Sequence, residues 1–219
     1  ILIRDAQALE QFERIDVPVG QHYVPGASRR IEALHSGGVD IAAISRAAAD
    51  ALADDVRWQL FELGMHTYYS EHSLVVVTRK RSKRGQQKKR IGIDRSSPDH
   101  TELTYAEFPL DSEHEYIDCD FQYVPAAILE DRIDAAVWHH REMLVRLELM
   151  GLQARPLRRP EAQALRRRLS NAVLVCRADD KIVAALLAEL DLDDVGARQK
   201  HFIAAVAEGN DGAAIGWIR

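Results

Sequence analysis

The sequence predicts an α/β fold of two similar lobes, and the first observation behind this is an internal resemblance. Residues 22–46 and 122–140 each contain Tyr-Val-Pro, which we expect to be extended. In each copy a stretch with helical spacing of apolar residues follows, and then a short apolar strand that begins with an acidic residue. A strand, a crossover helix and a second strand form a βαβ unit, whose strands are parallel. Two such units roughly 100 residues apart predict two α/β lobes with a ligand cleft between them.

The second observation is a pair of apolar strands that lead into basic residues, as expected of segments crossing between lobes. Residues 79–90, which follow the first of them, hold eight Lys or Arg in twelve positions and read as a connector. We therefore expect lobe one at 1–78 plus 177–219, lobe two at 91–170, and connectors at 79–90 and 171–176. Two crossover strands would form a hinge able to close on a ligand.

Each element follows from hydrophobic spacing and from the residues that start and stop it. Helical spacing predicts helices at 5–14, 27–36, 46–53, 99–108, 125–131, 141–150, 160–169 and 181–190. Apolar runs predict strands at 17–24, 39–44, 73–78, 90–94, 114–121, 133–138 and 172–176. Gly37-Gly38 stops one helix, Pro160 opens another, and Asp179-Asp180 caps a third. Residues 55–64 are expected to be helical or irregular.

Composition limits the classes of protein that the chain can be. With 219 residues, 47% hydrophobic, it suits one large or two small globular domains. Its net charge of −5 argues against a chain that binds nucleic acid along its whole surface. The basic run either is a solvated loop or grips phosphates, and it has no interleaved aromatic residues that would stack on bases. No apolar run is long enough to span a membrane.

The cysteines and the N-terminus indicate in which cellular compartment the protein is expected to work. The two cysteines form no CxxC motif and no disulfide framework, which favours a reducing compartment, although a single bridge stays open. The chain begins at Ile1 without a signal segment, so it reads as a mature product or as a piece of a longer protein.

The first candidate ligand site is the start of the helix at 27–36. A helix N-terminus offers free backbone N–H groups and a partial positive charge, which suit an anion. Ser28 either caps this helix or donates its hydroxyl to a ligand. Arg29 or Arg30 either forks onto a carboxylate or phosphate or is simply solvated.

The second candidate is the segment 94–101, where an apolar strand runs into a dense set of hydrogen-bonding groups. Its candidate contacts are Asp94, Ser96, Ser97 and Asp99. The same residues also suit a well-capped helix start, with Asp or Ser at the cap and Pro just inside. The two roles are compatible.

Two further candidates lie at strand ends, where ligands bind in open α/β sheets. Ser45 and Arg46 end the apolar strand of the first repeat, and Trp138 and His139 end that of the second. Trp138 either faces a ligand or packs in the core. A last polar and aromatic group precedes strand 73–78, and its candidates are Tyr69, Glu71 and His72.

The motifs of several enzyme classes are missing. The sequence contains no GxGxxG, GxxxxGK[ST], HExxH or GxSxG. His139 and His140 are adjacent, so on a strand they point to opposite faces and cannot chelate one ion together. We therefore expect no catalysis, no cofactor and no metal.

Four stretches resemble the C-terminal effector domain of YhfZ-type bacterial transcription regulators, of the type 2 periplasmic-binding-protein fold. They are GASRRIEALHSGGVDIAAISRAAA at 26–49, LGMHTYYSEHSLVV at 63–76, RIGIDRSSPDHTELT at 90–104 and RIDAAVWH at 132–139. The stretch Gly-Ile-Asp-x-Ser-Ser-x-Asp-x-x-x-Leu-Thr at 92–104 is the most specific. The resemblance implies a cytoplasmic domain that senses a small molecule, while an N-terminal helix-turn-helix, absent here, binds DNA. It also implies that lobe one is truncated at its start.

The leading hypothesis is thus an effector domain that binds a small polar or anionic metabolite between its lobes and acts as a homodimer. It predicts no contact with a membrane. One alternative is an extracytoplasmic solute-binding protein of a transporter, which would use the same cleft. Another is an enzyme on this fold, such as a phosphoribosyltransferase-like protein.

Overall fold

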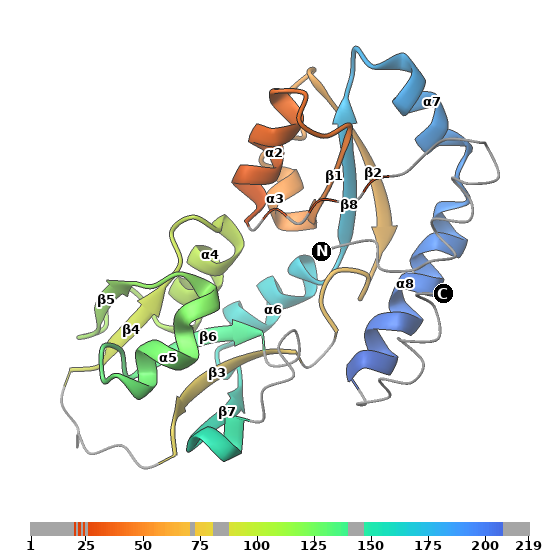
Figure 1. The fold of residues 1–219 in the computed structure, drawn as a ribbon. Helices are drawn as coiled ribbons and strands as arrows, with labels where there is room; N and C mark the ends of the chain where they lie inside the picture. The colour runs from red at the N-terminus through yellow and green to blue at the C-terminus, as the bar shows by residue number, and fades with distance from the viewer. Residues whose placement is uncertain are drawn as a thin grey trace. The chain divides into compact units, whose positions relative to one another are not determined.

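The computed structural model describes residues 20, 22, 24, 26–70, 73–80, 88–139 and 147–207. The chain divides into two compact units, each with its own β-sheet and helices (Figure 1). Unit 1 contains the residues up to Ser70 and those from Arg167 onward, and unit 2 contains Glu71–Arg166. Both units combine helices with a sheet, which confirms the predicted α/β class.

The sheet of unit 1 is built around β8 (Ala172–Arg177). Strands β1 (Ile41–Ser45) and β2 (Trp58–Gly64) flank β8, and both pair with it antiparallel. Residues 172–176 are apolar throughout and fully buried, because a central strand is covered on both faces. β8 therefore joins segments that are more than 100 residues apart in the sequence.

Helices cover the sheet of unit 1. α2 (Ala27–His35) and α3 (Arg46–Asp50) bury their apolar residues against side chains of β1, β2 and β8, including Ile44 and Trp58. α7 (Lys181–Glu189) contacts β2 and β8, and α8 (Leu192–Ala207) contacts β2. Figure 1 shows α2 and α3 on one side of this sheet and α8 on the other.

Unit 2 has a five-stranded sheet in the order β5-β4-β6-β3-β7. Its strands are β3 (Leu74–Arg79), β4 (Arg90–Ile93), β5 (Glu115–Asp118), β6 (Ala135–His139) and β7 (Leu152–Pro156). Its helices are α4 (Pro98–Glu107), α5 (Val124–Leu129) and the larger part of α6 (Pro160–Leu169), whose residues from Arg167 onward belong to unit 1. Unit 2 also has 3-10 turns at Phe121–Tyr123 and Leu147–Met150. β4 is parallel to both β5 and β6, whereas β3 is antiparallel to β6 and β7.

Most predicted elements are confirmed with small shifts of their ends. The exceptions fall where tertiary pairing decides the structure. Residues 55–64, expected to be helical or irregular, contain β2, because pairing with β8 satisfies the backbone of Trp58–Gly64. β7 and α8 were not predicted. Of the predicted helix 141–150, residues 141–146 lie outside the described residues, and Leu147–Met150 form a 3-10 turn.

The two halves of the predicted internal repeat differ in structure. In the second copy Tyr123 ends a 3-10 turn and Val124-Pro125 begin α5. The prediction that Tyr-Val-Pro is extended is therefore wrong for this copy. A proline at the start of a helix loses no hydrogen bond, which favours this arrangement. β5 instead supplies the strand before α5. In the first copy the apolar strand is β1, which pairs antiparallel with β8. The predicted helix 5–14 and the predicted strand 17–24 lie outside the described residues, apart from residues 20, 22 and 24.

The boundary between the units also differs from the predicted one. β3 pairs with β6 and β7 and therefore belongs to unit 2, not to the first lobe. β8 is the centre of the unit 1 sheet rather than a connector. The basic run 79–90 joins β3 to β4, two strands of the same sheet, so it does not cross between units.

Two further observations concern the cysteine thiols and the length of the helices. Cys119 and Cys176 are free and buried, and burial raises the pKa of both thiols. None of the helices in the described part of the chain is long and apolar enough to cross a membrane.

Candidate functional site

The strand order of unit 2 creates a switch point at the carboxyl end of β4. From β4 the chain passes through α4 to β5 on one side, and then through α5 to β6 on the other side. Since the three strands are parallel, their carboxyl ends lie at one edge of the sheet. The two connections diverge there, which is where open α/β sheets bind ligands. The candidate residues 94–99 follow β4, and the candidates Trp138 and His139 are the last two residues of β6, which also ends at this edge.

Asp94, the first residue after β4, holds this edge together. Its Oδ1 accepts hydrogen bonds from the backbone N–H and the hydroxyl of Ser96, at 2.9 and 2.6 Å. Its Oδ2 accepts from the backbone N–H of Phe121 at 3.1 Å, and its carbonyl accepts from the Thr101 hydroxyl. The carboxylate is thus engaged by the protein, and its role is to fix the loop against the segment that follows β5.

α4 begins as the sequence predicts, with Ser97 at the cap position and Pro98 just inside. Ser97 is only 9% exposed, yet its side chain makes no capping hydrogen bond. The buried side chain of Asp99 lies in the first turn of the helix. The hydroxyls of Ser96 and Ser97 and the start of α4 therefore form the polar part of this edge.

Aromatic side chains form the layer beneath the edge. The indole Nε1 of Trp138 donates to the carbonyl of Phe121 at 3.1 Å, and the two rings lie 6.1 Å apart. The ring of His100 lies 4.4 Å from that of Phe121. Trp138 and His139 are both buried, so the core role left open for Trp138 is the one observed. Phe121 was not among the predicted site residues because no motif marks it, whereas His100 lay within the predicted segment 94–101 but was not named as a contact.

In unit 1 the start of α2 differs from its prediction. Gly26 with φ +79° occupies the cap position and no side chain caps the helix, so a capping role for Ser28 is wrong. Ser28 and Arg29 are exposed on the first turn. Arg30 instead donates to the carbonyls of Val24 and Ala43 and to the Tyr68 hydroxyl. Only Arg29 of the two arginines is therefore left exposed to solvent.

Two of the remaining predicted residues, Tyr69 and Ser45, belong to unit 1, and two, Glu71 and His72, fall in the range of unit 2. Tyr69 is buried, with its ring edge-on to Tyr68 at 4.8 Å. Glu71 and His72 lie outside the described residues. Ser45 is fully buried, and its Oγ accepts from the Ala48 N–H as the cap of α3. These contacts make Ser45 and Tyr69 parts of the scaffold of unit 1.

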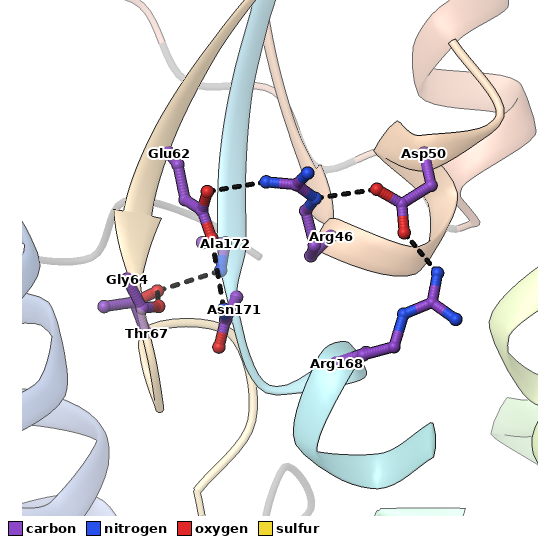
Figure 2. A network of polar contacts seen from close by, with 8 residues as sticks. All are labelled: Arg46, Asp50, Glu62, Gly64, Thr67, Arg168, Asn171 and Ala172. Carbon is purple, nitrogen blue, oxygen red and sulfur yellow. Dashed lines mark hydrogen bonds and ion pairs between the residues drawn. The ribbon is translucent and has the colours of Figure 1, made fainter. Parts of the chain in front are cut away.

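Arg46 belongs to a chain of polar contacts rather than standing free at the strand end (Figure 2). Its guanidinium pairs with Asp50 at 2.7 Å and with Glu62 at 2.6 Å. Asp50 also pairs with Arg168, and Glu62 accepts from the Asn171 amide at 3.2 Å. The charge of Arg46 is thus balanced within the protein.

These pairs give unit 1 a defined pH dependence. Burial raises the pKa of Asp50, but hydrogen bonds from Arg168 and Arg46 outweigh it, so the pKa lies below its usual 3.8. A lowered folded pKa gives stability that is present above about pH 4 and is lost as the pH falls through the folded pKa. We expect Asp50→Asn to reduce the unfolding free energy at pH 7 by about 1 kcal/mol or less.

Urea unfolding of wild type and Asp50→Asn between about pH 3 and 7 measures this effect. The difference between the two proteins should be constant above about pH 5 and should shrink as the pH approaches 3. A difference that stays unchanged down to pH 3 would contradict the assigned pairs. Asp54→Asn, an exposed residue nearby, is the control.

Comparison with known proteins gives consistent results. A family profile described as the YhfZ C-terminal domain matches residues 6–209. The uncharacterized protein YhfZ of Escherichia coli (strain K12) is 30% identical over 203 residues. This match covers 90% of the chain and 63% of that protein, so the chain spans less than two thirds of the relative's length.

Two solved structures place the fold. The crystal structure of YhfZ from Shigella flexneri matches with a TM-score of 0.67 and 28% identity, covering 95% of this chain and 84% of that one. The alkanesulfonate-binding protein SsuA from Xanthomonas axonopodis pv. citri, bound to MOPS, matches with a TM-score of 0.62 and 15% identity. That match covers 98% of this chain and 75% of SsuA. The fold is that of the periplasmic binding proteins.

Proposed function

Because the chain belongs to the YhfZ C-terminal domain family, we propose that it is a ligand-sensing domain for a small polar or anionic solute. The observation that carries the proposal is the switch point of unit 2. There the loop 94–97 and the start of α4 lie at the carboxyl edge of three parallel strands. The N-terminus of α4 beside the Ser97 hydroxyl, which makes no capping hydrogen bond, suits the oxygen atoms of an anion.

Because several candidate residues already bond within the protein, we propose fewer ligand contacts than the sequence alone suggested. Asp94, Ser45, Arg46 and Trp138 bond to other parts of the protein, and we assign them scaffold roles. In unit 2 we propose Ser97 as the contact, with Asp99 and His139 shaping the edge, and we assign Ser96, whose hydroxyl donates to Asp94, a scaffold role. In unit 1 we propose Ser28 and the exposed guanidinium of Arg29.

The wider role proposed is that of the effector domain of a bacterial transcription regulator. In this proposal a helix-turn-helix segment outside the chain binds DNA, the regulator is a cytoplasmic homodimer, and ligand binding changes the spacing of its DNA-binding segments. Escherichia coli YhfZ, being longer than this chain, has room for such a segment. DNA binding by the full-length protein, with and without ligand, tests this part.

A second candidate function is solute capture for a transporter. The fold shared with SsuA, an alkanesulfonate-binding protein, favours it. A transporter-type protein would bind its solute without any effect on DNA binding of the full-length protein. The same assay therefore separates the two functions.

Ligand binding is tested by the thermal unfolding of the purified chain with MOPS, short alkanesulfonates, alkylphosphonates and inorganic phosphate. A ligand present at about 100 times its dissociation constant should stabilise the fold by about 2.7 kcal/mol. Ser97→Ala and Arg29→Ala should each weaken the affinity for a ligand that binds about tenfold, the factor that corresponds to about 1.4 kcal/mol. Ser112→Ala removes a hydroxyl elsewhere in unit 2 and should leave the response unchanged.

Two results would count against the proposed site. One is a response that Ser97→Ala and Arg29→Ala leave intact, because the ligand would then bind elsewhere. The other is the absence of any response from a folded chain, which would remove the support for anion binding.

A further inference from the structure

The chain passes between the two units twice. One passage lies between Ser70 and Glu71, and the other lies within α6, between Arg166 and Arg167. On the unit 1 side, hydrogen bonds hold the two passing segments together. The N–H of Tyr68 donates to the carbonyl of Ser170, and the N–H of Ala172 donates to the Thr67 hydroxyl, both at 2.9 Å. The Thr67 hydroxyl in turn donates to the Gly64 carbonyl, which ties the pair to the end of β2 (Figure 2).

A chain of alternating charges fixes the end of α6 to unit 1. Figure 2 shows Asp50 of α3 between two guanidinium groups, those of Arg46 and Arg168. Arg46 also forms an ion pair with Glu62 of β2, and Glu62 accepts a hydrogen bond from the side-chain amide of Asn171, which follows α6. The backbone N–H of Arg46 also donates to the carbonyl of Asn171 at 2.8 Å. Arg168 in the last turn of α6 is therefore held through α3, and Asn171, which follows the helix, is held through β2.

The other end of α6, residues 160–166, belongs to unit 2, and local hydrogen bonds close its first turn. The Gln163 side chain donates to the carbonyl of Leu157, and the backbone N–H of Gln163 donates to the carbonyl of Arg159. A ten-residue α-helix is stiff, so a change in the setting of one end is transmitted to the other. The contacts of the last turn therefore act on an element whose two ends belong to different units.

The strength of these contacts suits control rather than bulk stability. The side chains of Arg46, Asp50 and Arg168 remain 43%, 31% and 59% exposed. Ion pairs at such exposure add little to folding free energy and are screened by salt. Contacts of this strength can break and re-form, whereas the buried core around β8 cannot rearrange as easily.

We propose that Asp50 is a positioning residue: by holding Arg46 and Arg168 it sets the last turn of α6, and so limits how far the two units move relative to each other. The adjustment of that movement by a ligand rests on the function proposed above, but the clamp itself does not. Removing the charge of Asp50 leaves the guanidinium of Arg168 without its partner and leaves Arg46 with Glu62 only. The last turn of α6 is then free to reset.

The test measures the distance between spin labels on the two units without any ligand. Val56→Cys in unit 1 and Leu110→Cys in unit 2 supply exposed sites, at 89% and 68% exposure. The native cysteines are buried with raised pKa values, so the labels attach at the introduced positions. Pulsed electron resonance then gives the distance distribution for wild type, Asp50→Asn and Arg168→Gln.

We expect both substitutions to broaden or shift the distribution, and about 1 M NaCl to move wild type toward Asp50→Asn. Amide exchange at Arg46 and Tyr68 should also accelerate roughly two- to fivefold in Asp50→Asn. Arg167→Gln, an exposed neighbour on the same turn with no ion pair among the described residues, should match wild type. Unchanged distributions in both variants, with native circular dichroism, would overturn the proposal whatever the ligand screen shows.

Discussion

Gly196→Ala is expected to reduce the unfolding free energy of unit 1 by about 2–4 kcal/mol. Gly196 lies in α8, where the helix crosses β2 so closely that a Cβ would stand 2.2 Å from the carbonyl oxygen of Leu63. This neighbour is backbone, which cannot move aside as a flexible side chain would. In an unobstructed helix the same substitution would stabilise the protein by about 1 kcal/mol, because alanine is the better helix former. The sign of the effect therefore reports the contact.

Urea unfolding combined with amide exchange of β8 measures this effect. Protection in β8 should fall in Gly196→Ala, since α8 would be pushed off the sheet to which β8 belongs. Ala197→Gly, at the next and exposed position, is the control and should cost only about 1 kcal/mol through helix propensity. A stabilised Gly196→Ala would mean that α8 does not cross β2 at this residue.

Glu107→Ala is expected to destabilise unit 2 by about 2–4 kcal/mol. The Glu107 side chain, at the end of α4, is 2% exposed. Its Oε1 accepts from Arg155 at 2.6 Å, and its Oε2 accepts from the backbone N–H groups of Arg158 and Arg159 at 2.9 and 3.2 Å. A carboxylate is disfavoured at the C-terminus of a helix, so these donors are what permit it. Truncation would leave two backbone amides without their acceptor and would remove the carboxylate partner of Arg155, which also donates to the Pro156 carbonyl.

Glu102→Ala, an exposed position on the same helix, controls for the loss of a negative charge and should stay within about 0.5 kcal/mol of wild type. Glu107→Gln should lie between the two, since an amide oxygen still accepts hydrogen bonds but carries no charge. Urea unfolding of the three variants measures the differences. Equal stabilities for Glu107→Ala and Glu102→Ala would show that the buried contacts contribute nothing.

The candidate site was only partly accessible from the sequence. The run of donors and acceptors after an apolar strand located the loop 94–97, and Ser97 and Pro98 open α4 as predicted. What Asp94 does was not predictable, because its partner Phe121 is 27 residues away and carries no motif. Arg46 looked like a ligand contact because the sequence does not bring Asp50, Glu62 and Arg168 together.

The sequence by itself determined the local elements and the class of fold. Apolar runs such as 172–176 and helix starts such as Asp180 ahead of α7 act within a few residues, so pattern and capping chemistry are enough to identify them. The tertiary structure alone decided which strands pair. It placed β3 in unit 2 and β8 at the centre of unit 1, and it made a strand of 58–64. Strand partners are chosen by burial and backbone hydrogen bonds between distant segments, and those terms exist only once the chain has folded.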